Sequence, residues 1–134
     1  TEPTATFSTC FGAPFLPLPP QRYATLLKAR LETYRVPVWL LNTGWSGGPY
    51  GIGQRMPIAV TRTLLSAELD GILETVPFRV DPIFDFAVPE LCPGVPRDLL
   101  NPRTTWANPD DYDRQARQLA GKFRDIRQGI DSAR

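Results

Sequence analysis

The sequence predicts a mixed α/β (α+β) fold made of short strands and about three helices. Two observations support this class: apolar residues recur at helical spacing in separate stretches, and short runs of β-forming residues stand between them, bounded by prolines. With 134 residues, 42% of them hydrophobic and 22% charged, the chain has the size and composition of one globular domain. No internal repeat or linker divides it, so we expect residues 1–134 to form a single segment.

The first third of the chain predicts a strand, a helix and a second strand. Polar and apolar residues alternate over Thr4–Thr9, which favours a short strand followed by a proline-rich apolar loop. Pro20 suits the first turn of a helix that continues from Gln21, with an apolar stripe at Tyr23, Leu26, Leu27, Leu31 and Tyr34. The run Val36–Leu41 is apolar and rich in β-formers, so it is predicted to be a buried strand.

The middle of the chain combines a glycine-rich stretch with a helix and two extended pieces. Asn42–Gly53 contains five of the ten glycines, so its backbone can take positive φ and approach a ligand closely. A helix is predicted over Thr61–Leu73, with one stripe formed by Leu64, Leu65, Leu69 and Leu73. Extended pieces are predicted at Pro77–Val80 and Phe84–Val88, and a loop over Pro89–Asn108.

The last predicted helix begins after Asn108, a good N-cap, with Pro109 at its first position. Its apolar stripe consists of Tyr112, Ala116, Leu119, Phe123 and Ile126. The acidic residues Asp110, Asp111 and Asp113 are explained by the helix start, because carboxylates there complement the positive end of the dipole and need no metal ion. Four arginines of this helix indicate a solvated face: Arg114, Arg117, Arg124 and Arg127.

The composition argues against several classes of function. The chain has no histidine, the commonest general base and metal ligand, and its two cysteines, Cys10 and Cys92, are too few for a zinc site of their own or a disulfide framework. We expect both cysteines to be reduced, as in a cytosolic protein, although one long-range disulfide is formally open. A net charge of +1 and the lack of a long apolar run argue for no nucleic acid partner and no membrane partner.

The glycine-rich stretch invites comparison with a phosphate-binding loop. Gly48 and Gly53 have the separation of a Walker A motif, but Gln54 and Arg55 stand where lysine and a hydroxyl residue are required. A tightly turned surface loop with no ligand is therefore an open alternative. Arg55, followed closely by Thr61, favours a ligand site, because a cation and a hydroxyl beside a permissive backbone can grip the phosphates, ribose or base edge of a nucleotide.

Several collinear blocks carry a resemblance to a known enzyme family. The blocks are TEPTATFSTCFGAPFLPL at 1–18, VWLLNTGWSGGPYGIGQRMPIAVTR at 38–62, DPIF with a following VP at 81–89, CPGVP at 92–96 and LNPRTTWA at 100–107. They resemble the C-terminal part of ATP-dependent phosphoenolpyruvate carboxykinase. The resemblance runs from Thr1 to about Phe123 and implies that this chain is a segment of that family's mixed α/β nucleotide-binding domain.

The resemblance also implies an activity. The family is a gluconeogenic, cytoplasmic carboxy-lyase that converts oxaloacetate and ATP to phosphoenolpyruvate, ADP and CO2, using Mg²⁺ with Mn²⁺. In that family the P-loop and the metal ligands lie upstream of the position of Thr1, so the implied partners are ATP or ADP and the rest of the carboxykinase chain. We therefore expect no catalytic and no metal-binding residue here, and no catalysis by the 134 residues alone.

By the same resemblance, this segment carries the adenine and ribose side of the ATP site. Arg55 and Met56 match the family's nucleotide-contacting pair, Thr61 matches its downstream threonine, and Phe15 matches a residue lining the adenine pocket. Without the resemblance, Phe15 would be read as a core residue of an apolar loop. Packing, rather than ligand contact, is expected for the three tryptophans, Trp39, Trp45 and Trp106.

The sequence departs from the family pattern at two positions, and one alternative interpretation of the chain is open. Gln54 stands where many members have lysine, and Asp85 stands at a place that is usually small or polar. The alternative is a stand-alone truncated paralogue that acts as a nucleotide-binding or protein-interaction module without catalysis. A piece of a larger sheet would also leave apolar surface exposed, so the isolated segment could self-associate.

Overall fold

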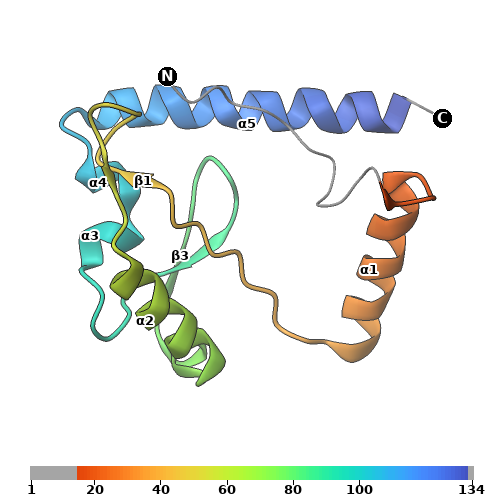
Figure 1. The fold of residues 1–134 in the computed structure, drawn as a ribbon, viewed down its shortest axis with the longest axis horizontal. Helices are drawn as coiled ribbons and strands as arrows, with labels where there is room; N and C mark the ends of the chain where they lie inside the picture. Colours follow the sequence, from red (N-terminus) through yellow and green to blue (C-terminus); the bar gives the residue numbers. More distant parts are fainter. Residues whose placement is uncertain (1–14, 133–134) are drawn as a thin grey trace. The chain divides into compact units, whose positions relative to one another are not determined.

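The computed structural model describes residues 15–132, so the predicted strand at Thr4–Thr9 lies outside the described residues. Contacts divide the chain into two units: Trp39–Phe123 forms one, and the residues on either side of it form the other. Within the described residues, helices accompany two small antiparallel sheets, β1–β2 and β3–β4 (Figure 1). This mixture confirms the predicted α+β class.

The predicted first helix is confirmed as α1, Pro20–Tyr34, with a proline in its first turn. It ends at Arg35, which has φ of 48° and whose amide N–H donates to the Leu31 carbonyl at 2.8 Å. This left-handed residue terminates the helix without a glycine. None of the side chains of α1 is buried, and Leu26, Leu27 and Tyr34 of the predicted apolar stripe are exposed.

The prediction of a buried strand at Val36–Leu41 is wrong. The backbone there forms no ladder with any described strand, and five of the six residues are exposed: Val36, Pro37, Val38, Leu40 and Leu41. A run that is apolar on both faces becomes a strand only when neighbouring strands and covering layers are present. Trp39 alone packs against the core, and its ring lies 5.9 Å from that of Phe78.

The glycine-rich stretch forms a hairpin. Strand β1, Trp45–Ser46, pairs antiparallel with β2, Gln54–Arg55, so that Trp45 lies opposite Arg55 and Ser46 opposite Gln54. The connecting loop includes Gly47 at φ 82° and Gly51 at φ 86°, values that side chains disfavour. The prediction of a permissive backbone with positive φ is therefore confirmed.

The second helix differs from its predicted bounds. Helix α2 runs over Ile58–Leu69, three residues earlier than expected, and Gly71 at φ 71° separates it from a 3₁₀ helix, η2, at Ile72–Thr75. The predicted stripe is consequently split: Leu64 and Leu73 are buried, whereas Leu65 and Leu69 are exposed. A continuous helix would have required right-handed helical backbone geometry at Gly71. Instead, the Gly71 carbonyl accepts a hydrogen bond from the Glu74 amide at 3.2 Å, which closes a turn.

The next two predicted extended pieces form the second hairpin. Strand β3, Phe78–Val80, confirms the first, while β4, Ala87–Pro89, begins later than predicted. The turn between them is organised by Asp81, whose carboxylate accepts from the amides of Ile83 and Phe84 at 2.9 and 2.8 Å. Asp85 adopts φ of 59°, a left-handed conformation that aspartate tolerates better than most residues.

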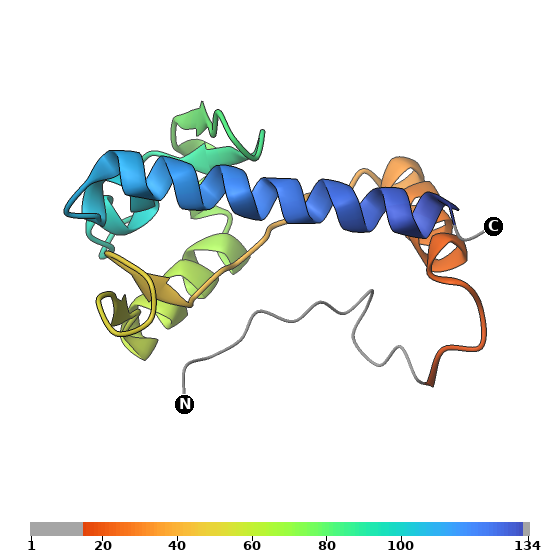
Figure 2. The ribbon, with the colours of Figure 1, turned by 90° about the horizontal axis from the view of Figure 1, so that it is seen from above.

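The prediction of a loop over Pro89–Asn108 is wrong in its second half. Two one-turn helices occur there, α3 at Arg97–Leu100 and α4 at Pro102–Thr105, and a proline stands at or just before the start of each. The final helix α5 extends over Pro109–Ser132 and is continuous in Figures 1 and 2. Asn108 caps it as predicted, because its side-chain oxygen accepts from the Asp110 amide at 3.0 Å.

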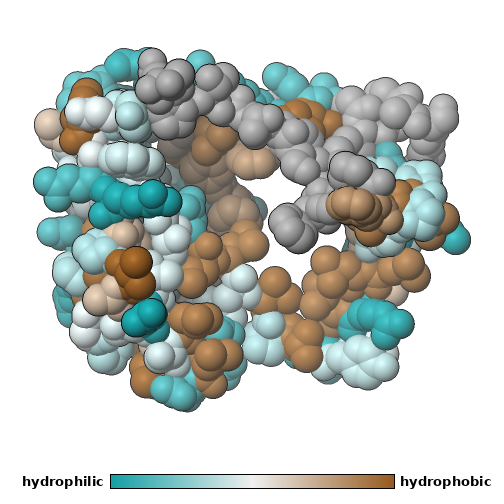
Figure 3. Space-filling model, viewed as in Figure 1, coloured by the Kyte–Doolittle hydropathy of each residue, from teal (hydrophilic) through white to brown (hydrophobic). Residues whose placement is uncertain are grey.

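A small core lies within Trp39–Phe123, where α2 and η2 pack against residues 92–100. Its buried members are Leu64, Ala67, Leu73, Cys92, Val95 and Leu100. On α5, Ala116 and Ala120 are buried, but Leu119 and Phe123 of the predicted stripe are exposed. Figure 3 shows further apolar side chains, in brown, gathered on the visible surface. In residues 15–132 no helix combines the length and apolar character needed to cross a bilayer.

Candidate functional site

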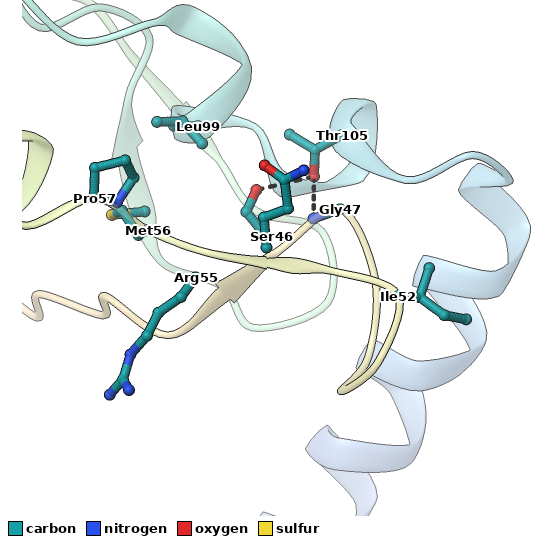
Figure 4. Close-up of a pocket in the computed structure, with 9 residues that line it drawn as sticks. Ser46, Gly47, Ile52, Arg55, Met56, Pro57, Leu99 and Thr105 are labelled. Atoms are coloured by element: carbon teal, nitrogen blue, oxygen red, sulfur yellow. Dashed lines mark hydrogen bonds between the residues drawn. The ribbon is translucent and has the colours of Figure 1, made fainter.

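A pocket of about 380 Å³ lies beside the glycine-rich hairpin, within Trp39–Phe123 (Figure 4). Two parts of the chain line it: the hairpin with the residues that follow it, and the α3–α4 segment. The lining residues are Ser46, Gly47, Ile52, Gln54, Arg55, Met56, Pro57, Leu99 and Thr105. The pocket thus combines apolar side chains, hydroxyl and amide groups, and one guanidinium.

Close backbone packing gives the hairpin its shape. The amides of Ile52 and Gly53 both donate to the Pro49 carbonyl, at 3.1 and 2.9 Å, and the Trp45 ring meets Tyr50 edge to face at 5.5 Å. A Cβ on Gly53 would lie 2.8 Å from the Ser46 carbonyl oxygen and closer still to that of Gly48. Glycine at 53 is therefore required by space, which explains why the loop can fold back onto β1.

Arg55, the last residue of β2, and Met56, which follows it, both line the pocket. The Met56 amide donates to the Gly44 carbonyl at 3.0 Å, which extends the hairpin by one further contact, and the Met56 side chain packs against the core. Arg55 is exposed, and in Figure 4 it extends to the side away from Leu99 and Thr105. This pair therefore offers a fixed apolar surface next to a cation that is free to reach a ligand.

Thr105, at the end of α4, forms the opposite side of the pocket. Its hydroxyl accepts from the Gly47 amide at 3.0 Å and from the Ser46 hydroxyl at 3.3 Å, and it donates to the Pro102 carbonyl at 2.7 Å. A hydroxyl has one donor and two acceptor positions, so all of them are occupied. The dashed lines in Figure 4 mark the contacts to the hairpin.

An ion pair connects α4 to α5. The Arg103 guanidinium donates to both carboxylate oxygens of Asp113, at 2.9 and 3.3 Å, and Arg117 lies 3.8 Å from the same carboxylate. The hydrogen bond from Arg103 holds the pKa of Asp113 below its ordinary value. Beside this pair, the rings of Trp106 and Tyr112 meet edge to face at 5.8 Å, so two contacts of different kinds fix α4 on the first turns of α5.

The predicted site residues fall in different places. Arg55 and Met56 come together in the pocket, whereas Thr61 does not line it: Thr61 lies in the first turn of α2, and its amide donates to the Pro57 carbonyl at 3.3 Å. Phe15 belongs to the other unit and its side chain is 89% exposed, so the alternative reading of Phe15 as a core residue is wrong for the described residues.

The sequence reasoning did not propose Ser46, Thr105 or Leu99 as site residues. The sequence does carry a signal for the helix that ends at Thr105, because Asn101–Pro102 repeats the helix-start pattern of Asn108–Pro109, but that signal does not connect Thr105 to the hairpin. Each tryptophan ring packs against another aromatic ring, as the packing part of the prediction requires: Trp39 on Phe78, Trp45 on Tyr50, and Trp106 on Tyr112.

The described residues do not fit a metal centre, since no group of three or more His, Cys, Asp or Glu side chains is close enough among them to hold an ion. Cys92 is a free thiol that belongs to the buried core, and burial raises its pKa. Cys10 lies outside the described residues. The glycine-rich loop also differs from a P-loop in position, because β2 stands between it and α2.

The structure is thus an α+β segment in which a glycine-rich hairpin lies beside a pocket of mixed apolar and polar lining. The chain belongs to the phosphoenolpyruvate carboxykinase family, whose sequence pattern matches residues 1–98. It is 57% identical over 123 residues to the phosphoenolpyruvate carboxykinase (ATP) of Caldanaerobacter subterraneus subsp. tengcongensis, and 58% identical over 125 residues to that of Thermus thermophilus. These alignments cover 92% and 93% of this chain, which spans about a quarter (24%) of the length of each relative.

Proposed function

We propose that this chain supplies the adenine and ribose side of the ATP site in an ATP-dependent phosphoenolpyruvate carboxykinase. The observation that carries the proposal is the pocket beside the glycine-rich hairpin, which unites Arg55 and Met56. Its apolar wall, formed by Met56, Pro57 and Leu99, suits a flat ring. The Gln54 amide and the acceptor positions of the Ser46 hydroxyl suit a sugar or a base edge. The Arg55 guanidinium suits negative charge on the same ligand.

The remaining two residues of the predicted site extend this proposal. Thr61, in the first turn of α2, would hydrogen-bond the base or sugar, and Phe15 would pack on the adenine ring. The exposure of Phe15 supports this role only in that its ring is accessible to a ligand. Gln54 also lines the pocket and offers an amide, where a lysine would offer a charge.

We further propose that residues 1–134 are the C-terminal part of the nucleotide-binding domain of a longer carboxykinase. Two observations support this: the chain spans 24% of the length of the relatives that it matches, and its apolar run at Val36–Leu41 has no strand partner among the described residues. The P-loop and the ligands of Mg²⁺ and Mn²⁺ would then come from the rest of the chain. When bound, the metal ions would supply positive charge that neutralises the phosphates of ATP, and no step of that chemistry falls to the residues described here.

The proposed reaction of the complete protein is the cytoplasmic, gluconeogenic conversion of oxaloacetate and ATP to phosphoenolpyruvate, ADP and CO2. The bond to the departing carboxylate breaks to give CO2 and the enolate of pyruvate, and the enolate oxygen takes the γ-phosphoryl group while ADP leaves. In this division of labour, the present segment binds and orients the nucleotide. The isolated 134 residues should therefore show no oxaloacetate-dependent consumption of ATP. Turnover by the isolated segment would contradict the proposal that catalysis depends on the rest of the carboxykinase chain.

The test of the site is Arg55→Ala in the complete carboxykinase polypeptide that carries this chain. We expect the Kd for ATP, measured by titration calorimetry, to rise about tenfold, since a charge-assisted contact of this kind contributes about 1.5 kcal/mol. Arg62→Ala is the matched control, because Arg62 is an exposed arginine of α2 that does not line the pocket. Unchanged ATP affinity in Arg55→Ala would remove Arg55 from the site.

A further inference from the structure

The two strands of the hairpin that carries Arg55 are only two residues long each. A ladder this short is marginal in water without additional contacts. The additional contacts are therefore what determine where Arg55 and Gln54 lie. Within the described residues, both hydrogen bonds that join this hairpin to α4 end at one side-chain atom, the hydroxyl oxygen of Thr105.

The contact between the hairpin and α4 is close because Gly47 has no side chain. A Cβ at Gly47 would lie 3.3 Å from the Thr105 carbonyl oxygen, φ of 82° at Gly47 is disfavoured for residues with a side chain, and the Gly47 amide donates to the Thr105 hydroxyl at 3.0 Å. The partners of that hydroxyl are adjacent residues, Ser46 and Gly47, so it holds two successive positions at the end of β1. Ser46 lies opposite Gln54 in the ladder, next to the Trp45–Arg55 pair.

The other end of this connection is also fixed. Thr105 closes a one-turn helix, α4, which is too short to be stable alone. The Arg103–Asp113 ion pair and the Trp106–Tyr112 ring contact attach α4 to α5. A continuous set of contacts therefore leads from α5 through Thr105 to β1 and across the ladder to Arg55.

We propose that Thr105 is the positioning residue of this pocket: its hydroxyl holds β1 against α4 and thereby sets the place of Arg55 on the neighbouring strand. The inference rests on the proposed role of Arg55 in nucleotide binding and deepens it. Thr105 acts through the hairpin, so its contribution to ATP affinity depends on Arg55 being present. That dependence separates positioning from a contribution to general stability.

The test uses Thr105→Val and Thr105→Ser in the complete carboxykinase polypeptide. Valine keeps the shape of threonine and loses the hydroxyl, whereas serine keeps the hydroxyl and loses a methyl group. We expect Thr105→Val to raise the Kd and the KM for ATP about tenfold with little change in kcat, and Thr105→Ser to stay within about threefold of the wild-type protein. Equal losses in the valine and serine variants would overturn the proposal, because the methyl group would then be what matters.

The decisive measurement is a double-mutant cycle with Arg55→Ala. If Thr105 acts through Arg55, then Thr105→Val should raise the Kd for ATP by less than about twofold once Arg55 is alanine, against about tenfold when Arg55 is present. If Thr105→Val raised the Kd for ATP by the same factor with Arg55 and with alanine at position 55, the positioning role would be overturned. If the Thr105→Val variant does not fold, Ser46→Ala takes its place in the cycle. Ser46→Ala removes only one of the two hydrogen bonds to the Thr105 hydroxyl, so it should raise the Kd for ATP by a smaller factor, with the same dependence on Arg55.

The outcomes separate this inference from the proposed function. If Arg55→Ala leaves ATP affinity unchanged, the nucleotide role of Arg55 fails and the positioning role of Thr105 fails with it. If Arg55→Ala weakens ATP binding while Thr105→Val and Ser46→Ala do not, the proposed function stands and the positioning role alone is overturned.

Discussion

Replacing Gly53 with alanine should open the hairpin that lies beside the pocket. The added Cβ would lie 2.8 Å from the Ser46 carbonyl oxygen, against 3.4–4 Å for ordinary contact, and it would clash more severely with the Gly48 carbonyl. Both neighbours are backbone atoms, so neither can rotate away. Overpacking of this kind costs about 2 kcal/mol, and here the hairpin can relieve it only by separating β1 from β2.

Hydrogen exchange of the hairpin amides provides the assay. A local loss of about 2 kcal/mol corresponds to exchange about 30-fold faster at the Met56 amide, which bonds to Gly44 across the hairpin. Gly44→Ala is the matched control, because a Cβ there meets only Asn42 Oδ1, at 3.5 Å, and the φ of Gly44 is not in the left-handed region. Exchange in Gly53→Ala within threefold of the wild-type rate would refute the steric reasoning.

Two further predictions concern titratable groups. Because Arg103 lowers the pKa of folded Asp113, ionised Asp113 stabilises the fold above the ordinary carboxyl pKa of 3.8, and this contribution is lost as the pH falls through the lower folded value. The stability difference between wild type and Asp113→Asn in urea melts should therefore shrink below pH 3.8, and a difference independent of pH would contradict the ion pair. Burial raises the pKa of Cys92, so its thiol should react slowly in the native protein. Alkylation by iodoacetamide at pH 8, followed by peptide mass spectrometry, should be at least about tenfold slower in the native protein than in urea. Equal alkylation rates would contradict the burial of Cys92.

Elements with local signals were predictable from the sequence. Helix α1 follows from its apolar spacing and its first-turn proline, and the start of α5 follows from Asn108 and Pro109. The prediction of a buried strand at Val36–Leu41 was wrong because the conformation of that run depends on strand partners, which a local sequence pattern does not reveal. The end of α2 was misplaced because its leucine spacing continues past Gly71, whose positive φ breaks the helix.

In the candidate site, too, some residues could be predicted from local sequence and others could not. Arg55 and Met56 could be proposed because they directly follow a glycine-rich stretch, which is a local feature. Thr105 could not be linked to them, because its hydrogen bonds reach Ser46 and Gly47 across 59 and 58 positions of sequence. No periodicity or motif specifies a contact of that length, so the part of the site that fixes the hairpin emerges only from the tertiary structure.

The two-residue strands of the hairpin also bear on how long a ligand would stay bound. By this reasoning a ladder of this length opens at lower free energy than the core around Leu64, so we expect the hairpin side of the pocket to open without unfolding of that core. A ligand bound in the pocket would then leave at a rate set by that opening, and substitutions that slow the opening would lengthen its residence time without adding any contact to it.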